Sequence, residues 1–471
     1  MMKKKKLAIV ILGAGKGKRM KSKKAKVLHL LAGRPMIEYT VDLAESLHSD
    51  KIVLVVGYQG DRVKALLEDK KIDIVEQKEQ LGTAHAIIQS KGVLKNFKGN
   101  ILVLSGDVPL LKKETLIRLL KEQDKLGSVV TVLTARIPEP YGYGRVLRKK
   151  DSSIEKIVEE GDATKKERRI NEINSGIYCF KKDFLFNTLQ TIKRDNVQKE
   201  FYLTDIIEIA RKRNLSVHAL LADDSNEIMG INTRVDLANI EQTMRKNILS
   251  KLMLNGVTII DPSSTFIDST VNIGKDTIIY PHTQIYGNTK IGEDCVIMSH
   301  SVIINSSIAH SVEIKGFVFI TESTIGNNAK IGPFTHFRPE TILKEGVKIG
   351  NFVEIKKSVV GKGSKAPHLT YIGDSTIGKK VNIGAGTITC NYDGREKHQT
   401  IINDGVFVGS DTQFVAPIKV GKGAYIAAGT TVTKDVPPYS LTLSRTDQIN
   451  KENWVLQKIK EEKGKKDKKE K

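Results

Sequence analysis

The sequence predicts an α/β domain with a Rossmann-like, mostly parallel sheet, followed by a helical linker and a parallel β-helix of hexapeptide repeats. Three observations support this prediction. β-rich and helical runs alternate up to about residue 230, apolar residues recur at helical spacing over 233–255, and Ile-Gly or Val-Gly pairs recur from residue 256 onward. A chain of 471 residues is too long for one ordinary core, so separate domains are expected.

The first part, residues 1–232, has the pattern of a doubly wound α/β domain. Its strand-like runs are LAIVIL (7–12), KIVLVVG (51–57), IDIVEQ (72–77), NILVLSGD (100–107) and SVVTVLTA (128–135). Helical stretches such as 35–47 and 83–94 lie between them. Strands that alternate with helices predict a parallel sheet with its ligands at the carboxyl ends of the strands.

Residues 233–255 predict one amphipathic helix that serves as a linker. The apolar positions recur at close to 3.6-residue spacing. They are Val235, Leu237, Ile240, Met244, Ile248 and Leu252.

The third part, residues 256–450, predicts a parallel β-helix. Ile-Gly or Val-Gly pairs begin at 273, 291, 325, 331, 349, 360, 377, 383, 408 and 420, and several gaps are multiples of six. Hexads of this kind predict coils of three short strands whose aliphatic residues point inward. Such coils often pack side by side with other subunits, so a homotrimer is expected. The lysine-rich residues 451–471 are predicted to be a disordered tail.

Composition narrows the class of protein. Hydrophobic residues at 39% and charged residues at 28% describe a soluble globular protein, and the three well-separated cysteines form neither a disulfide framework nor a zinc motif. The apolar run 7–12 is short for a signal peptide, and we expect neither stable membrane insertion nor export from the cytoplasm.

A net charge of +22 favours polyanionic substrates. Nucleic acid is not expected, because no aromatic and basic recognition motif is present.

The loop LGAGKGKRM (12–20) after the first strand predicts a phosphate site. It does not fit the P-loop, because the required Gly-Lys-Ser/Thr ending is absent. It does not fit the dinucleotide fingerprint either, because Lys18 stands where a third glycine is needed. Glycines still let backbone N–H groups approach phosphate oxygens. The nearby cations are Lys16, Lys18, Arg19 and Lys26. Asp107 ends a later strand, where a carboxylate is a natural Mg²⁺ ligand. A basic surface loop and a turn aspartate are the alternative interpretations.

A second site is predicted around His368 in the segment KAPHLTY (365–371), which interrupts the hexads as an inserted loop or a coil corner would. With an ordinary pKa of about 6.5, an imidazole can take a proton from an attacking amine at neutral pH. A buried structural histidine is the alternative. For the whole repeat region, the alternative is a pure scaffold.

Motifs of the first part resemble, in order, those of the sugar-1-phosphate nucleotidyltransferases. They are LGAGKGKRM, Lys26, EQLGTAHA (79–86), SGDVP (105–109), GYGR (142–145), VEE (158–160), EINSGIY (172–178) and GINTR (230–234). The QLGTAHA form looks like the branch that uses UTP with N-acetylglucosamine 1-phosphate. Two positions depart from the commonest family loop, with Gly13 in place of Ala and Lys18 in place of Thr.

This resemblance implies a role for each matching residue. Arg19 would act on the UTP phosphates as a catalytic residue, and Asp107 and Asn232 would hold Mg²⁺. The residues implied to bind UTP or UDP-N-acetylglucosamine are Leu12, Gly13, Ala14, Gly15, Lys26, Gln77, Gly82, Thr83, Ser105, Asp107, Gly144, Glu159, Asn174 and Asn232. Within this set, Gln77, Gly82 and Thr83 would read the uracil edge, and Gly144, Glu159 and Asn174 would hold the sugar phosphate.

The third part resembles the acetyl-CoA-dependent hexapeptide acetyltransferases, which have a left-handed β-helix. The matching segments are RPE (338–340), GNFVEIKKS (350–358), HLTYIGD (368–374), NIGAGTITCNYDG (382–394), VFVGSDTQFVAP (406–417) and IAAGTTVTKD (426–435). Glu340 departs from the family, which has Gly after Arg-Pro. Together the two resemblances cover about residues 5–450. They match the bifunctional family of UDP-N-acetylglucosamine pyrophosphorylases and glucosamine-1-phosphate N-acetyltransferases.

This second resemblance implies that His368 is the general base. Glucosamine 1-phosphate would be bound by Arg338, Lys356, Tyr371 and Asn382. Acetyl-CoA would be bound by Ala385, Asn391, Tyr392, Ser410, Ala428 and Arg445, with Asn391 and Tyr392 near the sugar or acetyl group.

The function implied is acetyl transfer from acetyl-CoA to glucosamine 1-phosphate, then uridylyl transfer from UTP with release of pyrophosphate. The product, UDP-N-acetylglucosamine, is a precursor of bacterial cell-envelope polymers. One alternative is a nucleotidyltransferase with a non-catalytic β-helix used for assembly or regulation. A second is a structural solenoid with an inert head.

Overall fold

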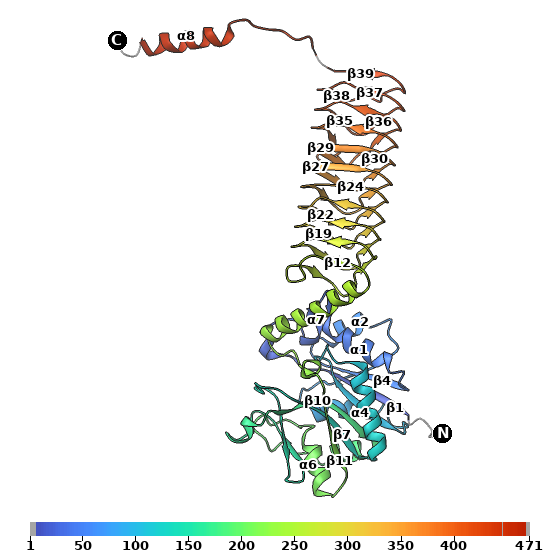
Figure 1. The fold of residues 1–471 in the computed structure, drawn as a ribbon, viewed down its shortest axis with the longest axis vertical. Helices are drawn as coiled ribbons and strands as arrows, with labels where there is room; N and C mark the ends of the chain where they lie inside the picture. The colour runs from blue at the N-terminus through green and yellow to red at the C-terminus, as the bar shows by residue number, and fades with distance from the viewer. Residues whose placement is uncertain (1–5, 445, 468–471) are drawn as a thin grey trace. The chain divides into compact units, whose positions relative to one another are not determined.

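The computed structural model describes residues 6–444 and 446–467, which fold as two compact units. The first unit contains the chain up to Lys251 together with Ile267–Thr270, and the second contains Leu252–Phe266 and the chain from Val271 onward. Each unit has its own sheets (Figure 1). No helix in the described part of the chain is long and apolar enough to cross a membrane.

The first unit is built on a mixed sheet with strand order β11-β7-β10-β6-β1-β4-β5. The strands are β1 (Leu7–Gly13), β4 (Lys51–Val56), β5 (Asp73–Glu76), β6 (Asn100–Ser105), β7 (Val130–Arg136), β10 (Glu172–Lys181) and β11 (Val217–Leu221). β1 pairs in parallel with β4 and β6, whereas β10 is antiparallel to β6 and β7. The five predicted strands are confirmed. The predicted mostly parallel sheet is confirmed too, with antiparallel pairing confined to β10 and to β8 (Arg145–Arg148) and β9 (Ile154–Val158), which extend the sheet from β10.

Helices cover the sheet on both faces, and two apolar cores result. The helices are α1 (Met36–Ser46), α2 (Gly60–Leu66), α3 (Thr83–Ile88), α4 (Lys113–Leu126), α5 (Lys182–Leu189) and α6 (Asp205–Lys212). Alternate residues of β1 point into opposite cores: Ile9 and Ile11 into one, Ala8 and Val10 into the other. This arrangement places the ends of β1 and β6 side by side, where ligands of such sheets bind.

The predicted linker helix is α7 (Arg234–Leu254). Its residues Ile240 and Met244 are buried in a third cluster with Met20, Leu31 and Met36, so the helix packs on the first unit. A carboxylate of Glu241 accepts a hydrogen bond from the backbone N–H of Ala32 at 2.9 Å.

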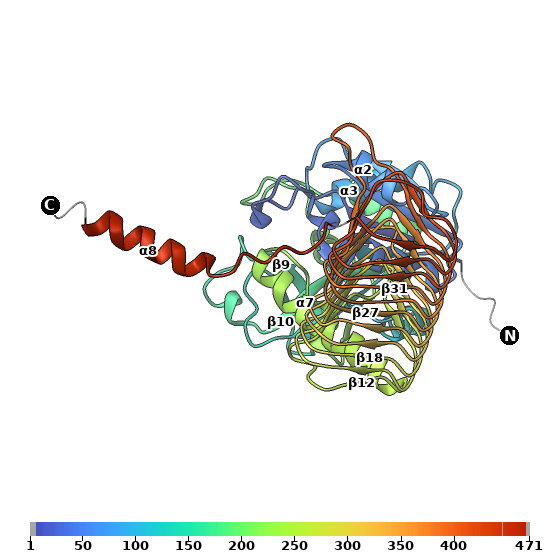
Figure 2. The ribbon, with the colours of Figure 1, turned by 90° about the horizontal axis from the view of Figure 1, so that it is seen from above.

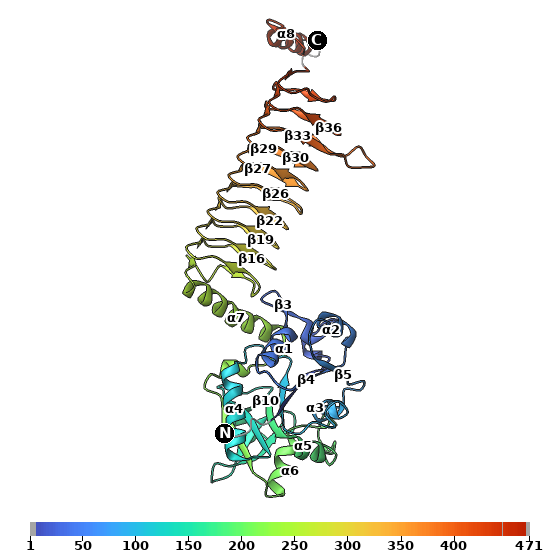
Figure 3. The same cartoon turned by 90° about the vertical axis from the view of Figure 1, so that its right-hand side faces the viewer.

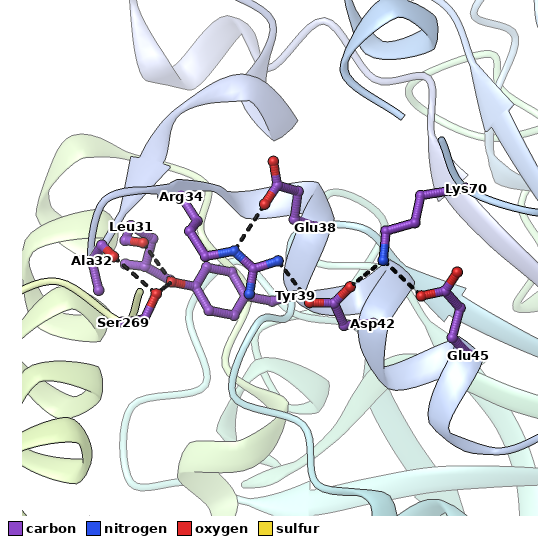
Figure 4. Close-up of polar contacts among 9 residues, drawn as sticks. All are labelled: Leu31, Ala32, Arg34, Glu38, Tyr39, Asp42, Glu45, Lys70 and Ser269. Carbon is purple, nitrogen blue, oxygen red and sulfur yellow. Dashed lines mark hydrogen bonds and ion pairs between the residues drawn. The ribbon is translucent and has the colours of Figure 1, made fainter. Parts of the chain in front are cut away.

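A polar network along α1 attaches residues 267–270 to the first unit (Figure 4). The hydroxyl of Tyr39 donates to Leu31 O at 2.7 Å and lies 2.9 Å from the Ser269 hydroxyl, and burial raises the pKa of Tyr39 to about 12. Arg34 contacts Glu38 at 2.8 Å, and further ion pairs continue the network along the helix.

The second unit is the predicted β-helix, seen as stacked coils in Figures 1 and 2. One of its sheets consists, in order, of β14 (Asn272–Ile273), β17 (Lys290–Ile291), β20 (Ser307–Ile308), β23 (Thr324–Ile325), β26 (Ile342–Leu343), β28 (Val359–Val360), β30 (Ser375–Ile377), β33 (Thr400–Ile402) and β36 (Ile418–Val420). Equivalent aliphatic residues of consecutive coils pair in register, starting with Ile273 and Ile291, and they are mostly buried. That pairing spans three hexads, so each coil uses about three repeats, as the pattern predicts. Parallel pairing of successive coils stacks the same position along the whole domain.

The chain beyond the β-helix contains helix α8 (Trp454–Asp467). Its described side chains, up to Lys463, are all exposed. The helical conformation agrees with the strong helix propensity of lysine and glutamate. The prediction of a disordered tail also extends over residues 468–471, which lie outside the described residues.

Candidate active sites

A glycine loop follows β1 at the carboxyl edge of the sheet. Gly13 and Ala14 are buried, Leu12 is half-buried and Gly15 is exposed. Gly17 has a φ of +66°, and a Cβ there would lie 2.7 Å from Lys26 Cβ, so only glycine fits. The loop is therefore held against Lys26, as the phosphate-site prediction requires.

Beside this loop, Lys26 joins the two residues predicted to bind a metal. Its ammonium donates to Asn232 Oδ1 at 2.8 Å and is ion-paired with Asp107 Oδ2. Arg19 also donates to Asn232 Oδ1 at 2.8 Å. Residues that are far apart in sequence thus form one cluster of two cations and two oxygen donors.

The backbone around Asn232 is fixed on both sides. The N–H of Ile231 donates to Asp107 O at 3.0 Å. The N–H groups of Asn232 and Thr233 both donate to Asp236 Oδ2, while the Thr233 hydroxyl accepts from the N–H of Asp236, which forms a capping box at the start of α7. The capping box therefore positions Asn232 opposite Asp107.

Gln77, Gly82 and Thr83 lie together after β5 and at the start of α3. Gln77 is buried, and its Nε2 donates to Gly82 O at 3.1 Å. Gly82 has a φ of +111° and precedes the exposed Thr83, whose hydroxyl accepts from the N–H of Leu203. This geometry places a buried amide beside a glycine turn.

The predicted sugar residues also cluster. The N–H of Asn174 donates to Gly144 O at 2.9 Å, and a Cβ on Gly144 would lie 3.4 Å from Glu159 Oε2. Burial raises the pKa of Glu159, and the Thr204 hydroxyl donates to its Oε1 at 3.1 Å. Ser105, at the end of β6, pairs in register with Leu12.

Lys18, which departs from the family loop, is exposed at the edge of this site. Its charge partly offsets the effect of burial, which raises the pKa of Glu200. The structure thus gives Lys18 an acidic neighbour.

In the second unit, the predicted phosphate-binding cations occupy matching positions of consecutive coils. Arg338 follows β25 (His336–Phe337) and Lys356 ends β27 (Lys348–Lys356), whose pairing places them side by side. The next matching position is Gly373 in β29 (Lys365–Gly373). A Cβ there would lie 2.4 Å from the Tyr371 hydroxyl and 2.7 Å from Asn391 Nδ2, so both side chains converge above Gly373.

Two charged residues of this site were missed by sequence reasoning. Glu354 accepts from Arg338 at 3.1 Å, so the partner of Arg338 is Glu354, while Glu340 is exposed. Lys397 lies beside Lys356 and lowers its pKa, and burial lowers it further. Lys397 comes from the loop between β32 (Ile388–Cys390) and β33 (Thr400–Ile402); Figure 3 shows a loop projecting beside β33. The longer interval between Ile377 and Ile402 is the signal that could have revealed this loop.

His368 is exposed, so the buried alternative is wrong. Its Nδ1 lies 3.0 Å from Asn351 Oδ1, the residue that pairs with it in the preceding coil. The segment 365–371 keeps the register of β27 and β29, so it is a coil corner without an insertion.

Three of the predicted acetyl-CoA residues, Ala385, Ser410 and Ala428, follow His368 along one corner of the β-helix. His368 and these three residues each precede a corner residue with positive φ, namely Leu369, Gly386, Asp411 and Gly429. Backbone bonds Gly386 N to Leu369 O, Asp411 N to Ala385 O and Gly429 N to Ser410 O connect these coils. The column beyond His368 is therefore Ala385, Ser410 and Ala428.

The remaining predicted residues are more scattered. Asn382 begins β31 (Asn382–Ile383) and pairs in register with Lys365. Tyr392 is exposed beside the buried Asn391, and its hydroxyl donates to Gly394 O at 2.8 Å. Arg445 lies outside the described residues.

The fold and the two sites define a two-domain transferase, with a nucleotidyltransferase sheet in one unit and an acyltransferase β-helix in the other. Residues 8–227 match the nucleotidyl transferase family, and residues 262–349 match the GMPPB C-terminal domain. Three relatives carry the name bifunctional protein GlmU. Those of Geotalea uraniireducens, Trichlorobacter lovleyi and Caldanaerobacter subterraneus are 51%, 49% and 48% identical, and each comparison covers 96% of this chain and at least 98% of the relative.

The chain belongs to the GlmU family of bifunctional enzymes and has both a uridylyltransferase and an acetyltransferase activity. The fold predicted from sequence, including the left-handed β-helix, is that of this family. The two alternatives without this pair of activities are therefore not supported. Family membership implies nucleotide and acetyl-CoA substrates and a divalent metal in general terms.

Proposed function

We propose that the second unit acetylates glucosamine 1-phosphate with acetyl-CoA, and that the first unit then joins the product to UTP and releases pyrophosphate. The observation that carries this proposal is the pair of separate phosphate-binding clusters. One consists of Lys26, Arg19 and the glycine loop, and the other of Arg338, Lys356 and Lys397. The corresponding division of the chain is 1–232, a linker over 233–255, and 256–450.

In the uridylyl site, the side chains would position the two substrates and neutralise the charge of the triphosphate. A sugar-phosphate oxygen attacks the α-phosphorus of UTP, and the bond to pyrophosphate breaks. The glycine loop would bind the phosphates with Arg19 and Lys26 beside it, while Gln77, Gly82 and Thr83 bind the base. Gly144, Glu159 and Asn174 would hold the sugar. Glu159 lies in a buried position where a carboxyl can accept from or donate to a sugar hydroxyl.

Mg²⁺ is the metal we propose for this site. Asp107 and Asn232 fit it, because their side-chain oxygens already share one cation, the ammonium of Lys26, and Asn232 Oδ1 also accepts from Arg19. Two protein oxygens leave room for phosphate and water ligands, which Mg²⁺ prefers. When bound, the metal would offset charge that develops on the triphosphate. Lys26 would then have to release both oxygens and turn toward the phosphates.

In the acetyl site, His368 would accept a proton from the sugar amine as the amine attacks the thioester carbonyl and CoA thiolate leaves. Asn351 Oδ1, which lies 3.0 Å from Nδ1, would accept from Nδ1–H and so leave Nε2 as the unprotonated base. Arg338, Lys356 and Lys397 would bind the substrate phosphate, with Tyr371, Asn382 and Asn391 around the sugar. The column Ala385, Ser410 and Ala428 has small side chains and leaves space for the pantetheine arm of acetyl-CoA. Tyr392 and Arg445 would complete its binding.

The decisive experiment supplies all substrates to the purified chain and follows free thiol and pyrophosphate together. Thiol release with glucosamine 1-phosphate and acetyl-CoA alone, and pyrophosphate release that needs UTP and Mg²⁺, are expected. His368→Ala should abolish the first activity and keep the second with N-acetylglucosamine 1-phosphate supplied. Asp107→Ala should do the reverse. Loss of both activities in either folded variant would contradict the proposed division.

A homotrimer in the cytoplasm is proposed for the assembled enzyme. Phe317, Phe334 and Phe352 stack at the same corner of consecutive coils, yet about half of each ring is exposed at 54%, 48% and 57%. An exposed apolar row of this kind favours a protein contact. Leu369 continues the row next to His368, so a second copy packed there would also border the acetyl site. A monomeric mass in sedimentation at micromolar concentration would contradict the trimer.

A further inference from the structure

His85 lies in α3 with a glutamine amide against each ring nitrogen. Its Nδ1 is 3.0 Å from Gln77 Nε2, and its Nε2 is 3.2 Å from Gln89 Nε2. The ring also stacks on Phe201, with the centroids 6.3 Å apart. Since Gln77 belongs to the proposed base-binding group, the protonation of His85 bears directly on that site.

The hydrogen bonds of Gln77 determine which nitrogen of His85 carries the proton. Gln77 Nε2 also donates to Gly82 O at 3.1 Å, and a carbonyl oxygen can only accept. The NH₂ group of Gln77, and not its Oε1, must therefore face Gly82 O. His85 Nδ1, which faces the same NH₂ group, must accept its second hydrogen.

Gln89 also requires a hydrogen-bond acceptor on this ring, but at the other nitrogen, Nε2. Its Nε2 donates to His85 O at 3.0 Å, so its NH₂ group also faces a ring nitrogen. A neutral imidazole has one N–H and cannot accept at both nitrogens. Gln77 is only 3% exposed, whereas Gln89 is half-buried and can turn to water. The Gln77 amide therefore decides which nitrogen accepts, because leaving a buried polar group unpaired costs more free energy than leaving a half-buried one unpaired. The ring proton is thus on Nε2.

We propose that His85 is a positioning residue that holds the Gln77 amide with its oxygen toward the nucleotide base. Both hydrogens of the Gln77 NH₂ group are occupied, and within residues 6–444 and 446–467 no donor contacts Oε1. A free acceptor suits uracil, whose N3 carries hydrogen, and repels cytosine, whose N3 is an acceptor. His85 thereby favours UTP over CTP. This inference rests on the proposed role of Gln77.

Two contacts, rather than one, resist a flip of the Gln77 amide. With the ring proton of His85 on Nε2, a flipped amide oxygen would face both Gly82 O and the Nδ1 lone pair. Without an acceptor at position 85, only Gly82 O opposes the flip. Removing the acceptor should therefore weaken the preference for UTP without abolishing it.

The test compares kcat/KM for UTP and for CTP in full-length His85→Leu, His85→Asn and Gln89→Leu. His85→Leu should lower the UTP-to-CTP ratio roughly fivefold to tenfold, the worth of one hydrogen bond. His85→Asn should keep the ratio close to that of the unmodified protein, because Asn Oδ1 can replace Nδ1 as the acceptor. Gln89→Leu should also keep it. Thermal unfolding of the first unit in the same preparations serves as the folding control.

An unchanged ratio in His85→Leu, or the same loss in His85→Asn, would overturn the inference. A separate variant tests the proposed function itself. If Gln77 does not bind the base, Gln77→Leu would leave the KM for UTP unchanged. If His85→Leu does not fold, nitrogen NMR of the unmodified chain decides, with the signals assigned from His85→Asn. A pyridine-type Nδ1 and a pyrrole-type Nε2 are expected. The reverse assignment would overturn the inference.

Discussion

The ammonium of Lys26 lies 2.8 Å from Asn232 Oδ1 and is also ion-paired with Asp107. One side chain of the first unit therefore occupies the position between the two oxygens proposed to bind a metal. On the proposed assignment, a divalent ion would reach both oxygens only after this ammonium moved, so metal binding would be coupled to the release of Lys26.

Replacing Lys26 with Met should separate metal binding from catalysis. We expect Mn²⁺, used as a probe for Mg²⁺, to bind at least as tightly, because no ammonium competes for the oxygens. Uridylyl transfer should fall roughly a hundredfold, as expected when one donor to a developing charge is lost. Electron paramagnetic resonance measures the binding, and pyrophosphate release measures the rate. Arg19→Met, which removes a contact to Asn232 alone, is the matched control. Weaker Mn²⁺ binding in Lys26→Met would contradict the coupling.

Asn351→Leu should slow acetyl transfer by removing the contact that orients His368. General bases commonly contribute a factor of a hundred or more, and loss of orientation alone should cost roughly tenfold. Asn351→Asp retains an acceptor for Nδ1–H and should be affected less. Thiol release measures the rate, while thermal unfolding of the second unit in the same sample checks folding. Equal rates in Asn351→Leu and the unmodified enzyme would show that the contact has no catalytic value.

Glu354 and Glu340 should differ in their effect on the acetyl site. Glu354 pairs with Arg338 and competes with a substrate phosphate, so Glu354→Gln should lower the KM for glucosamine 1-phosphate roughly twofold to fivefold. Glu340→Gln should leave that KM unchanged, because Glu340 is exposed and Arg338 pairs elsewhere. Steady-state kinetics at fixed acetyl-CoA measure both. A larger change in Glu340→Gln than in Glu354→Gln would reverse this assignment.

Asp205 should make the first unit less stable as pH rises. Burial, followed by Glu208 and Asp162, raises the pKa of Asp205 from 3.8 to about 6. Between these values the unfolded chain loses the proton that the folded chain retains, so the contribution of Asp205 to stability is lost as pH rises through this window. Asp205→Asn should therefore stabilise the unit at pH 7.5 by about 1 kcal/mol, after allowance for the partial exposure of the group. At pH 4 it should have little effect. Calorimetry of the full chain at both pH values measures the difference, and equal shifts would contradict it.

The sequence was sufficient for the regular elements. Alternating β-rich and helical runs predicted β1, β4, β5, β6 and β7, and spaced Ile-Gly and Val-Gly pairs predicted the coils. These patterns are local or strictly periodic, so one sequence carries them. The antiparallel direction of β10 was not predicted, because strand direction depends on which neighbours the strand meets.

Within the sites, the sequence provided the residues on motifs but not their partners. Glu354 reaches Arg338 because it lies on the next coil, about three hexads further along the chain. Lys397 reaches Lys356 because the loop that carries it returns over the coil. His85 stands inside a quoted motif, yet its link to Gln77 appears only in the folded chain. Each contact joins side chains that no short spacing connects.

By itself, the sequence determined the two kinds of domain, because hydrophobic periodicity records which side chains face a core. It also determined which motifs carry cations, glycine turns and His368. The tertiary structure decided how these groups meet: Lys26 between Asp107 and Asn232, and Asn351 beside His368. The physical reason is that hydrogen bonds and ion pairs act over a few ångströms, while the residues that form them are separated by a coil or by most of a domain.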